Sequence, residues 1–247
     1  MDPRDRFSAT VDDYRRYRPD YPAALFDWLV EDAALEAGDL VVDVGCGTGI
    51  SSRALADRGL RVVGVDPNEA MLEAARREGG EVRYVRSDAE TLDASVLGEG
   101  VERCDAIVGA QSFHWIDLDR ALPRFRALLR PEGRVIAFWN LRDLTDPLMA
   151  AYEELLLERA PDYVDVGAEP RAASVAERVD PRRVAFPHAQ PLDRDAFFGR
   201  VWSSSYVKHG VTDRPSFDAA LGELFDRFAV EGEVRFVYRT IALSFLP

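Results

Sequence analysis

The amino-acid sequence predicts a doubly wound α/β fold, in which helices cover both faces of a mostly parallel β-sheet. Between residues 40 and 140, short apolar runs typical of buried parallel strands alternate with amphipathic helical patterns. A glycine-rich loop at residues 45–49 follows the first apolar run, and the second run ends in an acid, Asp66. Ligands of doubly wound folds bind at the carboxyl ends of the strands, so we expect a binding site there.

The first 140 residues contain the patterns of five strands and four helices. Pro22 opens the first helix, Gly38 stops it, and Asn68 caps the third helix. The expected helices span residues 22–37, 51–58, 69–77 and 118–129. The expected strands span residues 40–44, 61–65, 82–86, 104–109 and 134–139, with a turn at residues 131–133 before the last of them.

The alternation of strands and helices ends after residue 140. Leu148 and Tyr152 mark an amphipathic helix, which is followed by a polar stretch up to Pro181. We expect this segment to be an insertion over the sheet edge. The remaining expected elements are a strand at 183–186, a helix capped by Asp193, a helix with an apolar face from Phe217 to Phe228, and a strand at 233–245.

Composition limits the class of protein. With 247 residues, 47% of them hydrophobic, the chain is expected to form one domain with a sizeable core. The net charge of −13 argues against nucleic-acid binding, which needs a basic surface. The apolar runs are too short for a membrane span and the N-terminus is charged, so we expect a cytoplasmic protein. Cys46 lies in the glycine loop and Cys104 just before an apolar strand, so no structural disulfide is expected.

The first loop and the acid after the second strand carry the strongest signal for a nucleoside ligand. The pattern D-x-G-x-G-x-G is formed by Asp43, Gly45, Gly47 and Gly49, with Cys46 inside it. Glycines let the backbone approach a ligand, and Asp66, 17 residues beyond Gly49, is placed to accept hydrogen bonds from both ribose hydroxyls. A nicotinamide-type G-x-G-x-x-G loop would need a third glycine where Ile50 stands.

This loop pattern resembles the first motif of class I S-adenosylmethionine (SAM) methyltransferases. In that class an acid after the third strand receives the adenine amino group, and residues 88–90 match this position. The sequence Phe-His-Trp at residues 113–115 and the run Y-x-x-Y-R-P-x-Y-P at residues 14–22 narrow the resemblance. They are similar to the methyltransferase type 11 group, which includes the trans-aconitate methyltransferases. The cofactor motifs cover residues 40–140, whereas residues 141–247 match only in general layout.

The resemblance implies a Rossmann-like sheet of seven strands with an antiparallel C-terminal hairpin. It divides the single domain into an N-terminal arm and helix at 1–38, a SAM-binding core at 39–140, and a substrate-side insertion with the C-terminal strands at 141–247. SAM is the implied cofactor. The residues expected to bind it are Tyr14, Tyr17, Arg18, Asp43, Gly45, Cys46, Gly47, Gly49, Asp66, Pro67, Asn68, Met71, Asp88, Ala89, Glu90 and Gln111.

The expected reaction is transfer of the SAM methyl group to a small-molecule acceptor, at a carboxyl or hydroxyl oxygen. The sulfonium is already activated, so the protein mainly aligns the acceptor and excludes water. A carboxylate acceptor needs no base but an arginine to hold it, for which Arg18 and Arg142 are candidates. A hydroxyl, phenol or amine acceptor would need a general base, for which His114 is the candidate, with Trp115 beside it as a substrate contact.

Two other functions stay open from the sequence. The chain could bind SAM without transferring its methyl group and act as a regulator, although the acids at positions 43, 66 and 88 argue against this. A nicotinamide-dependent dehydrogenase is disfavoured by Ile50 and by Asp88. No cluster of His, Cys and Asp has metal-ligand spacing, so we expect no metal, and we expect no nucleic-acid or membrane partner. The identity of the acceptor and the oligomeric state do not follow from the sequence.

Overall fold

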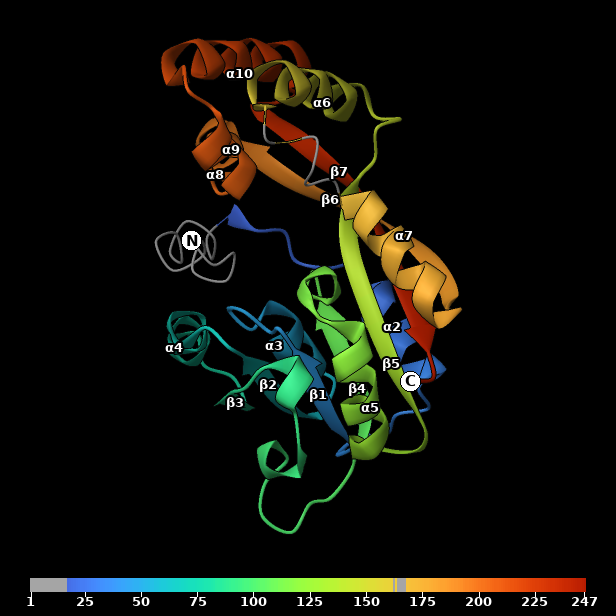
Figure 1. Cartoon of the computed structure of the whole chain (residues 1–247). Coiled ribbons are helices and arrows are strands. Elements are labelled where there is room, and N and C mark those ends of the chain that lie inside the picture. The colour runs from blue at the N-terminus through green and yellow to red at the C-terminus, as the bar shows by residue number, and fades with distance from the viewer. Residues whose placement is uncertain (1–16, 162, 164–167) are drawn as a thin grey trace. The chain divides into compact units, whose positions relative to one another are not determined.

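Figure 1 shows the computed structural model of the chain, which describes residues 17–161, 163 and 168–247. The chain divides into two compact units. Unit 1 comprises Met1–Pro19, Asn140–Glu169 and Pro187–Arg239, and unit 2 comprises Asp20–Trp139, Pro170–Phe186 and Thr240–Pro247. The expectation of a single domain stays a prediction.

The sheet has seven strands in the order β3-β2-β1-β4-β5-β7-β6. Their bounds are β1 (Leu40–Val44), β2 (Arg61–Asp66), β3 (Val82–Arg86), β4 (Cys104–Ala110), β5 (Leu129–Arg142), β6 (Arg182–Asp193) and β7 (Glu233–Phe245). The strand β1 pairs in parallel with β2 and β4, β2 with β3, and β4 with β5. The strands β6 and β7 form the antiparallel C-terminal hairpin at the other edge. The predicted fold, mostly parallel with this hairpin, is confirmed.

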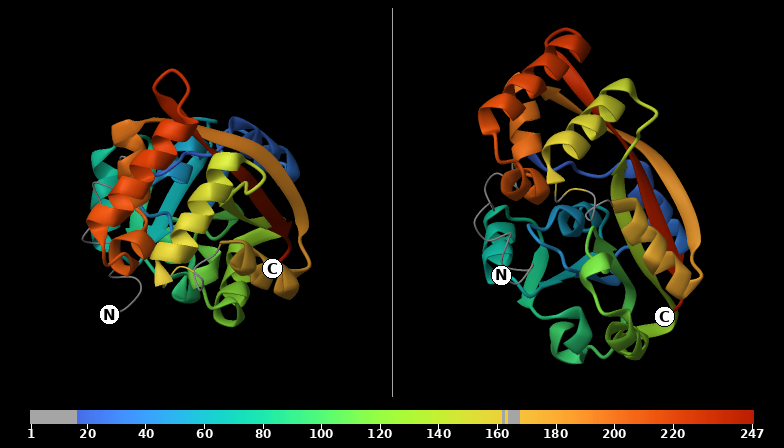
Figure 2. Two further views of the ribbon diagram at one scale, coloured as in Figure 1. Left: turned by 90° about the horizontal axis from the view of Figure 1, so that it is seen from above. Right: turned by 45° about the horizontal axis from the view of Figure 1, so that its top comes forward.

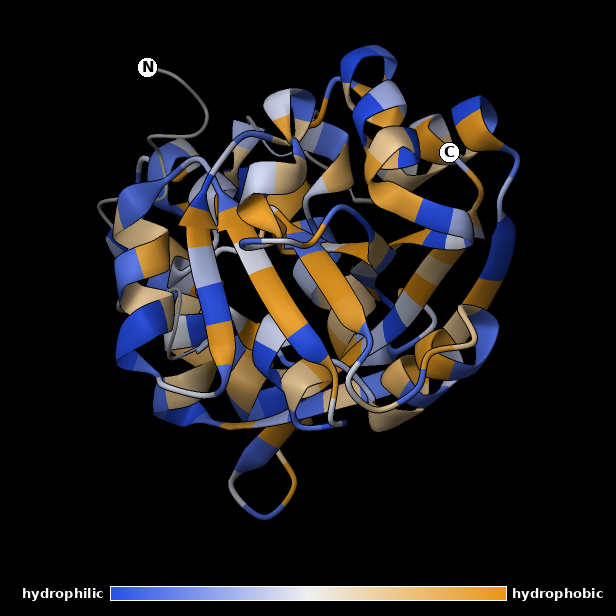
Figure 3. Cartoon of the chain, turned by 90° about the horizontal axis from the view of Figure 1, so that it is seen from below, coloured by the Kyte–Doolittle hydropathy of each residue, from blue (hydrophilic) through white to orange (hydrophobic). Residues whose placement is uncertain are grey.

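Buried parallel strands form the centre of unit 2. All five residues of β1 are buried, and Val42 lies in register with Val63 of β2 and Ile107 of β4. Strands are apolar along their whole length where both faces of a parallel sheet are covered. Figure 3 shows this as the orange, apolar colouring of the central strands. The valine-rich runs of the sequence therefore fold as expected.

The helices of unit 2 connect these strands. They are α2 (Ala23–Asp32), α3 (Ile50–Ala56), α4 (Glu69–Arg77), α5 (Leu118–Leu128) and most of α7 (Ala168–Val179). As predicted, Asn68 caps α4, and its Oδ1 accepts a hydrogen bond from the N–H of Ala70 at 3.0 Å. The helix α2 is shorter than expected, because Ala34 adopts a left-handed φ of 48° and the buried Leu35 turns inward. None of the helices in the described part of the chain is long and apolar enough to cross a membrane.

The described residues of unit 1 form four helices with an apolar core. They are α6 (Pro147–Arg159), α8 (Arg194–Trp202), α9 (Ser205–Gly210) and α10 (Arg214–Phe228). Aspartate side chains cap three of them, α6, α8 and α10. Figures 1 and 2 show α6 and α10 side by side. The core gathers buried side chains from α6, α8, α10 and β7, among them Tyr152, Phe197, Phe217 and Phe236.

Three elements differ from the sequence-based expectation. The strand β5 runs from Leu129 to Arg142, longer than the expected 134–139, and the turn expected at residues 131–133 lies inside it as a break in register between Leu129 and Arg134, where Glu132 has a left-handed φ of 67°. The strand β6 is longer than residues 183–186; it contains Pro187 and Pro191, which an edge strand tolerates but which hid its length in the sequence. The helix α7 lies in the stretch that was expected to be polar and irregular. Only Ala172 and Val175 of its described side chains are buried, too few for a clear apolar stripe.

Candidate functional site

The glycine loop between β1 and α3 is tied to the end of β2. The carboxylate of Asp66 accepts hydrogen bonds from the N–H of Gly47 at 2.9 Å and from the N–H of Asn68 at 2.8 Å. The N–H groups of Gly45 and Cys46 both donate to the carbonyl of Val65, at 2.8 and 3.1 Å. One acid at a strand end therefore orders both the loop and the start of α4.

The three glycines of the loop are needed for different reasons. A Cβ at Gly45 would lie 2.5 Å from the Cβ of Ser112, and a Cβ at Gly49 would collide with the hydroxyl of Tyr84. At Gly47 a Cβ would meet no atom of the described structure within 4 Å, and its φ is +54°. Gly45 and Gly49 therefore serve packing within the protein, whereas Gly47 faces open space that a ligand can fill.

Asp43 is a fully buried acid behind this loop. Its Oδ2 accepts hydrogen bonds from the hydroxyls of Ser51 and Ser52, both at 2.6 Å, and its Oδ1 has no hydrogen-bond partner among the described residues. Burial raises the pKa of Asp43 to about 6, which the two serine hydrogen bonds partly oppose and the charge of Asp66 increases. The unpartnered oxygen leaves an acceptor beside the loop for a ligand donor.

Asp66 keeps acceptor capacity for a ligand. It is 9% exposed, and burial raises its pKa, although the hydrogen bonds from Asn68 and Gly47 oppose the rise. An ionised carboxylate has about four lone-pair sites, of which the two N–H donors use two. A nucleoside with two adjacent ribose hydroxyls can occupy the others.

The remaining predicted contacts near β2 and β3 differ in their surroundings. Asp88 is partly buried and precedes a 3₁₀ turn at Ala89–Thr91, of which Ala89 is buried. Glu90 accepts a hydrogen bond from the N–H of Asp117 at 2.9 Å, so it anchors the start of α5. Met71 is buried in α4 as part of the core, and the carbonyl of Pro67 accepts a hydrogen bond from Arg86 at 3.2 Å. The burial of Cys46 raises the pKa of its thiol, so the thiol stays protonated.

The segment after β4 brings a histidine and a tryptophan together. Gln111 has a left-handed φ of 57°, which turns the chain out of the strand, and its N–H donates to the carbonyl of Phe138 at 2.8 Å. His114 lies in the 3₁₀ turn Phe113–Trp115. Its Nδ1 accepts a hydrogen bond from Nε1 of the fully buried Trp139 at 3.2 Å. The ring of Trp115, 47% exposed, lies 4.8 Å from the imidazole.

Three of the predicted site residues belong to unit 1 and not to unit 2. The ring of Tyr17 packs against Gly199 in α8, and its carbonyl accepts a hydrogen bond from Gln190 at 3.3 Å. Arg18 and Arg142 also belong to this unit. Tyr14 lies outside the described residues. The structure thus brings the acids, the glycine loop, Gln111 and His114 together in unit 2, and the tyrosine and arginines in unit 1.

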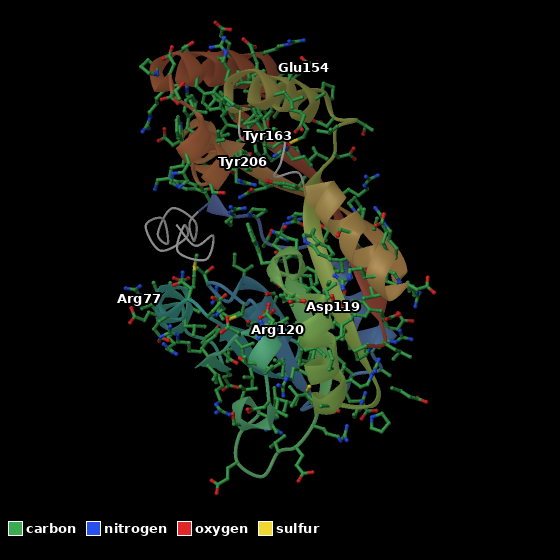
Figure 4. All side chains as sticks on the ribbon, in the orientation of Figure 1. Arg77, Asp119, Arg120, Glu154, Tyr163 and Tyr206 are labelled. Atoms are coloured by element: carbon green, nitrogen blue, oxygen red, sulfur yellow. The ribbon has the colours of Figure 1, made fainter. Side chains whose placement is uncertain are left out.

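Sequence reasoning missed two groups of residues. The first is Ser51 and Ser52, two adjacent serines in the first turn of α3 that hold Asp43. The second is a buried cluster in unit 1 made of Arg200, Glu153, Tyr152, Tyr163, Tyr206 and Tyr238, two of which Figure 4 labels (Tyr163 and Tyr206). The sequence contains one signal of this cluster, because Arg200 stands between Phe197 and Val201 on the apolar face of a helix. Within the described part of the chain no three His, Cys, Asp or Glu side chains form a group that could hold a metal ion.

Comparison with known proteins agrees with this geometry. The family Methyltransf_11, described as a methyltransferase domain, matches residues 42–137, which include the glycine loop, Asp66, Asp88 and His114. An uncharacterized methyltransferase of Mycobacterium tuberculosis is 39% identical over 140 residues, which cover 56% of this chain and 53% of that protein. The chain thus spans about half the length of the curated relatives that it matches first.

Solved structures show the same fold. A protein of Anaeromyxobacter dehalogenans, proposed to be a type II methyltransferase, is 26% identical with a TM-score of 0.71, and the match covers 93% of this chain and 98% of that one. A SAM-dependent methyltransferase of Geobacter sulfurreducens, solved with S-adenosyl-L-homocysteine, is 16% identical with a TM-score of 0.51, covering 98% and 97% of the two chains, and shares the fold.

These matches support a class I SAM-dependent methyltransferase with SAM as its cofactor, and the family match itself covers residues 42–137. The family model that matches residues 42–137 is that of the type 11 group, to which the motifs pointed. The finer resemblance to trans-aconitate methyltransferases is not confirmed and stays a prediction.

Proposed function

We propose that this protein transfers the methyl group of SAM to a carboxyl oxygen of a small-molecule acceptor. The observation that favours a carboxylate over a hydroxyl is the hydrogen bond from Trp139 to His114. The indole N–H is a donor only, and it points at Nδ1 of His114 across 3.2 Å. Nδ1 therefore acts as an acceptor and carries no proton.

This bond fixes the tautomer of the imidazole. With Nδ1 accepting, neutral His114 carries its proton on Nε2. Nε2–H is a hydrogen-bond donor, so neither ring nitrogen is prepared to take a proton from a hydroxyl. Trp139 is fully buried, which holds its N–H in place. His114 is then a positioning residue for an acceptor oxygen, in place of the general base that a hydroxyl acceptor would need.

A carboxylate acceptor fits such a donor. It is nucleophilic without losing a proton, and it accepts charge-assisted hydrogen bonds from an imidazole N–H or a guanidinium. Arg18 and Arg142 are the proposed guanidinium donors, and the exposed ring of Trp115 is a proposed apolar contact. The role of these residues is to orient the acceptor oxygen and to exclude water.

The residues around the glycine loop fit SAM, which supplies a methyl group activated on a positively charged sulfur. Gly47 leaves open space, Asp66 retains acceptor sites for ribose hydroxyls, and Asp43 offers an unpartnered oxygen. We propose the other predicted contacts at Tyr14, Tyr17, Arg18, Gly45, Cys46, Gly49, Pro67, Asn68, Asp88, Ala89 and Gln111 as well. Met71 and Glu90 are weaker proposals, because one is core and the other anchors Asp117.

The acceptor can be tested without knowing its identity. The protein is incubated with methyl-labelled SAM and a metabolite extract, and the labelled product is treated with mild alkali. A methyl ester releases labelled methanol, whereas a methyl ether or a methylamine keeps its label. Alkali-stable label would overturn the proposal of a carboxyl acceptor. Binding of SAM without any labelled product would favour the alternative function, a SAM-binding regulator.

Two variants of His114 then separate a positioning residue from a base. His114→Gln keeps an N–H near the place of Nε2 but has no basic nitrogen, whereas His114→Ala has neither. We expect His114→Gln to keep kcat within about tenfold and His114→Ala mainly to raise the acceptor KM, with SAM affinity unchanged in both. A fall of roughly 10²- to 10⁴-fold in kcat for His114→Gln would identify a general base and refute the positioning role.

We also propose that the protein works in the cytoplasm on a small molecule and binds neither nucleic acid nor membranes. Its net charge of −13 supports this, because nucleic acids and anionic lipid surfaces would repel it.

A further inference from the structure

Arg200, on α8 in unit 1, is a buried cation to which the described residues offer no carboxylate partner. Arg200 is 6% exposed. Nε donates to the hydroxyl of Tyr238 at 3.1 Å, and Nη1 donates to the hydroxyl of Ser204 at 3.0 Å. No ion pair joins Arg200 to an acid among the described residues. A guanidinium taken out of water needs a compensating negative charge, and two neutral hydroxyls do not supply one.

A second guanidinium, that of Arg142 at the end of β5, belongs to the same cluster. Nη2 donates to Glu153 at 2.6 Å and also to the hydroxyl of Tyr163, while Nη1 donates to the hydroxyl of Tyr206 at 2.9 Å. Nε is buried and has no hydrogen-bond partner among the described residues. Glu153 therefore balances only one of the two cations, and one donor of Arg142 is unused.

The positive charges of Arg142 and Arg200 act on the phenol of Tyr206, which lies on α9. Burial alone would raise the pKa of its phenol, but the charges of Arg142 and Arg200 outweigh burial and lower it to about 8. A hydrogen bond with Ser204 and the charge of Arg18 act in the same direction. The neighbouring phenols differ, since burial raises the pKa of Tyr152, on α6, and that of Tyr163. Tyr238, on β7, faces Arg200, and His188 of β6 stacks on its ring.

The excess positive charge of the cluster is compensated in one of two ways. Two guanidiniums and the Glu153 carboxylate leave one positive charge in excess among these residues. An ionised Tyr206 would neutralise one of these charges, and so would a bound anion. Both would lie beside the same guanidiniums, so an anion and a phenolate would repel each other and exclude each other.

We propose that Arg142, Arg200 and Tyr206 form an anion-binding site in unit 1, in which a bound carboxylate replaces the phenolate of Tyr206 as the counter-charge. Where the phenol is ionised, Tyr206 takes up one proton from solvent on binding and returns it on release. The anion site itself does not depend on the proposed function. Only the identity of its natural ligand, the carboxylate acceptor, rests on that function.

The first test follows the ionisation of Tyr206 through tyrosinate absorbance in the near ultraviolet. In wild-type protein one tyrosine should ionise near pH 8, about two units below an ordinary tyrosine. This step should be missing from Tyr206→Phe and present in Tyr163→Phe, a matched control that removes another phenol on Arg142. If the step is missing from wild type, or is still present in Tyr206→Phe, the role of Tyr206 is refuted.

The second test adds sodium acetate at about pH 9 and uses sodium chloride at equal ionic strength as control. Acetate should reduce the tyrosinate absorbance of wild type more than chloride does, because a carboxylate matches guanidinium donors. Equal effects of the two salts would mean charge screening only and would refute the site. Acetate affinity of the wild type should fall about tenfold from about pH 7 to about pH 9, since a phenol with a pKa of about 8 becomes ionised over that range.

The same pair of measurements on Tyr206→Phe completes the test. Its acetate affinity should stay constant over this pH range, because no phenol remains to ionise. An equal fall in the variant would assign the pH dependence to another group and contradict the proposal. None of these readouts uses methyl transfer, so a failure of the proposed reaction and a failure of this site give different results.

Discussion

Gly47→Ala is the substitution that tests the cofactor site most directly, because a matched control exists in the same unit. Gly47 has a φ of +54° and Gly79, which follows α4, has a φ of +74°. A Cβ at either position would meet no atom of the described structure within 4 Å. The two alanine variants therefore carry the same kind of backbone strain and no clash with the protein.

The expected size of each effect follows from this geometry. A left-handed alanine costs about 1 kcal/mol relative to glycine, which lowers Tm by roughly 2–4 °C in a protein of this length. Both variants should show this loss of stability. Only Gly47→Ala places its methyl group in the open space in front of the loop, so only it should weaken SAM binding. We expect a loss of tenfold or more, which corresponds to about 1.4 kcal/mol.

Isothermal titration with SAM and with S-adenosylhomocysteine measures the affinities, and thermal unfolding without ligand measures the strain. Wild-type affinity in Gly47→Ala, with Tm lowered as in Gly79→Ala, would show that the loop is only a turn and that the cofactor lies elsewhere. Equal weakening in both variants would mean that strain alone, and not contact with the cofactor, lowers the affinity.

Two further predictions concern the acids. Asp66→Ala should weaken SAM binding by roughly 2–3 kcal/mol in titration, the scale of charge-assisted hydrogen bonds, and unchanged affinity would exclude Asp66 as the ribose acceptor. For Asp43, burial raises the pKa from its ordinary 3.8 to about 6, so the folded state keeps a proton that the unfolded state loses. Stability of the wild type should therefore fall by about 3 kcal/mol between about pH 4 and pH 6, measured by urea unfolding. Asp43→Asn should lack the loss of stability that comes from ionising Asp43. An identical dependence of stability on pH in the variant would refute the assignment of this loss to Asp43.

The strands of unit 2 could be predicted from the sequence because local composition determines them. The expected bounds of β1 and β3 agree with the structure, since their apolar runs end at clear turn residues. The expected bounds of β7 also agree, because its alternation of Val234, Phe236 and Tyr238 is unbroken. The strand β6 could not be recognised at full length, because an edge strand needs no continuous apolar pattern and tolerates Pro187 and Pro191.

The proposed cofactor site follows from the sequence for the same reason. Asp43 and the three glycines lie within seven residues, and Asp66 follows at the next strand end, so one stretch of sequence holds most of the site. The bond between Trp139 and His114 was not predictable, because it joins β5 to the turn after β4 and depends on a rotamer. The partners of Arg142 in the buried cluster were missed because they come from α6, α8, α9 and β7, and single tyrosines in apolar helices look like ordinary core residues.

The charges of the two units are complementary to the two substrates of the proposed reaction. Unit 2 holds Asp43 and Asp66 in buried positions, and each acid has its pKa raised, so both gain from a cationic ligand. SAM carries a sulfonium and an ammonium group and meets that need. Unit 1 holds Arg142 and Arg200, of which only Arg142 pairs with a carboxylate among the described residues, and a carboxylate acceptor meets the opposite need. The net charge of −13 hides this separation, because it sums surface residues that take no part in either site. A hydroxyl acceptor would leave the excess positive charge of unit 1 to be compensated by Tyr206 alone, whereas a carboxylate compensates it directly, which is a second reason, independent of His114, to expect a carboxylate.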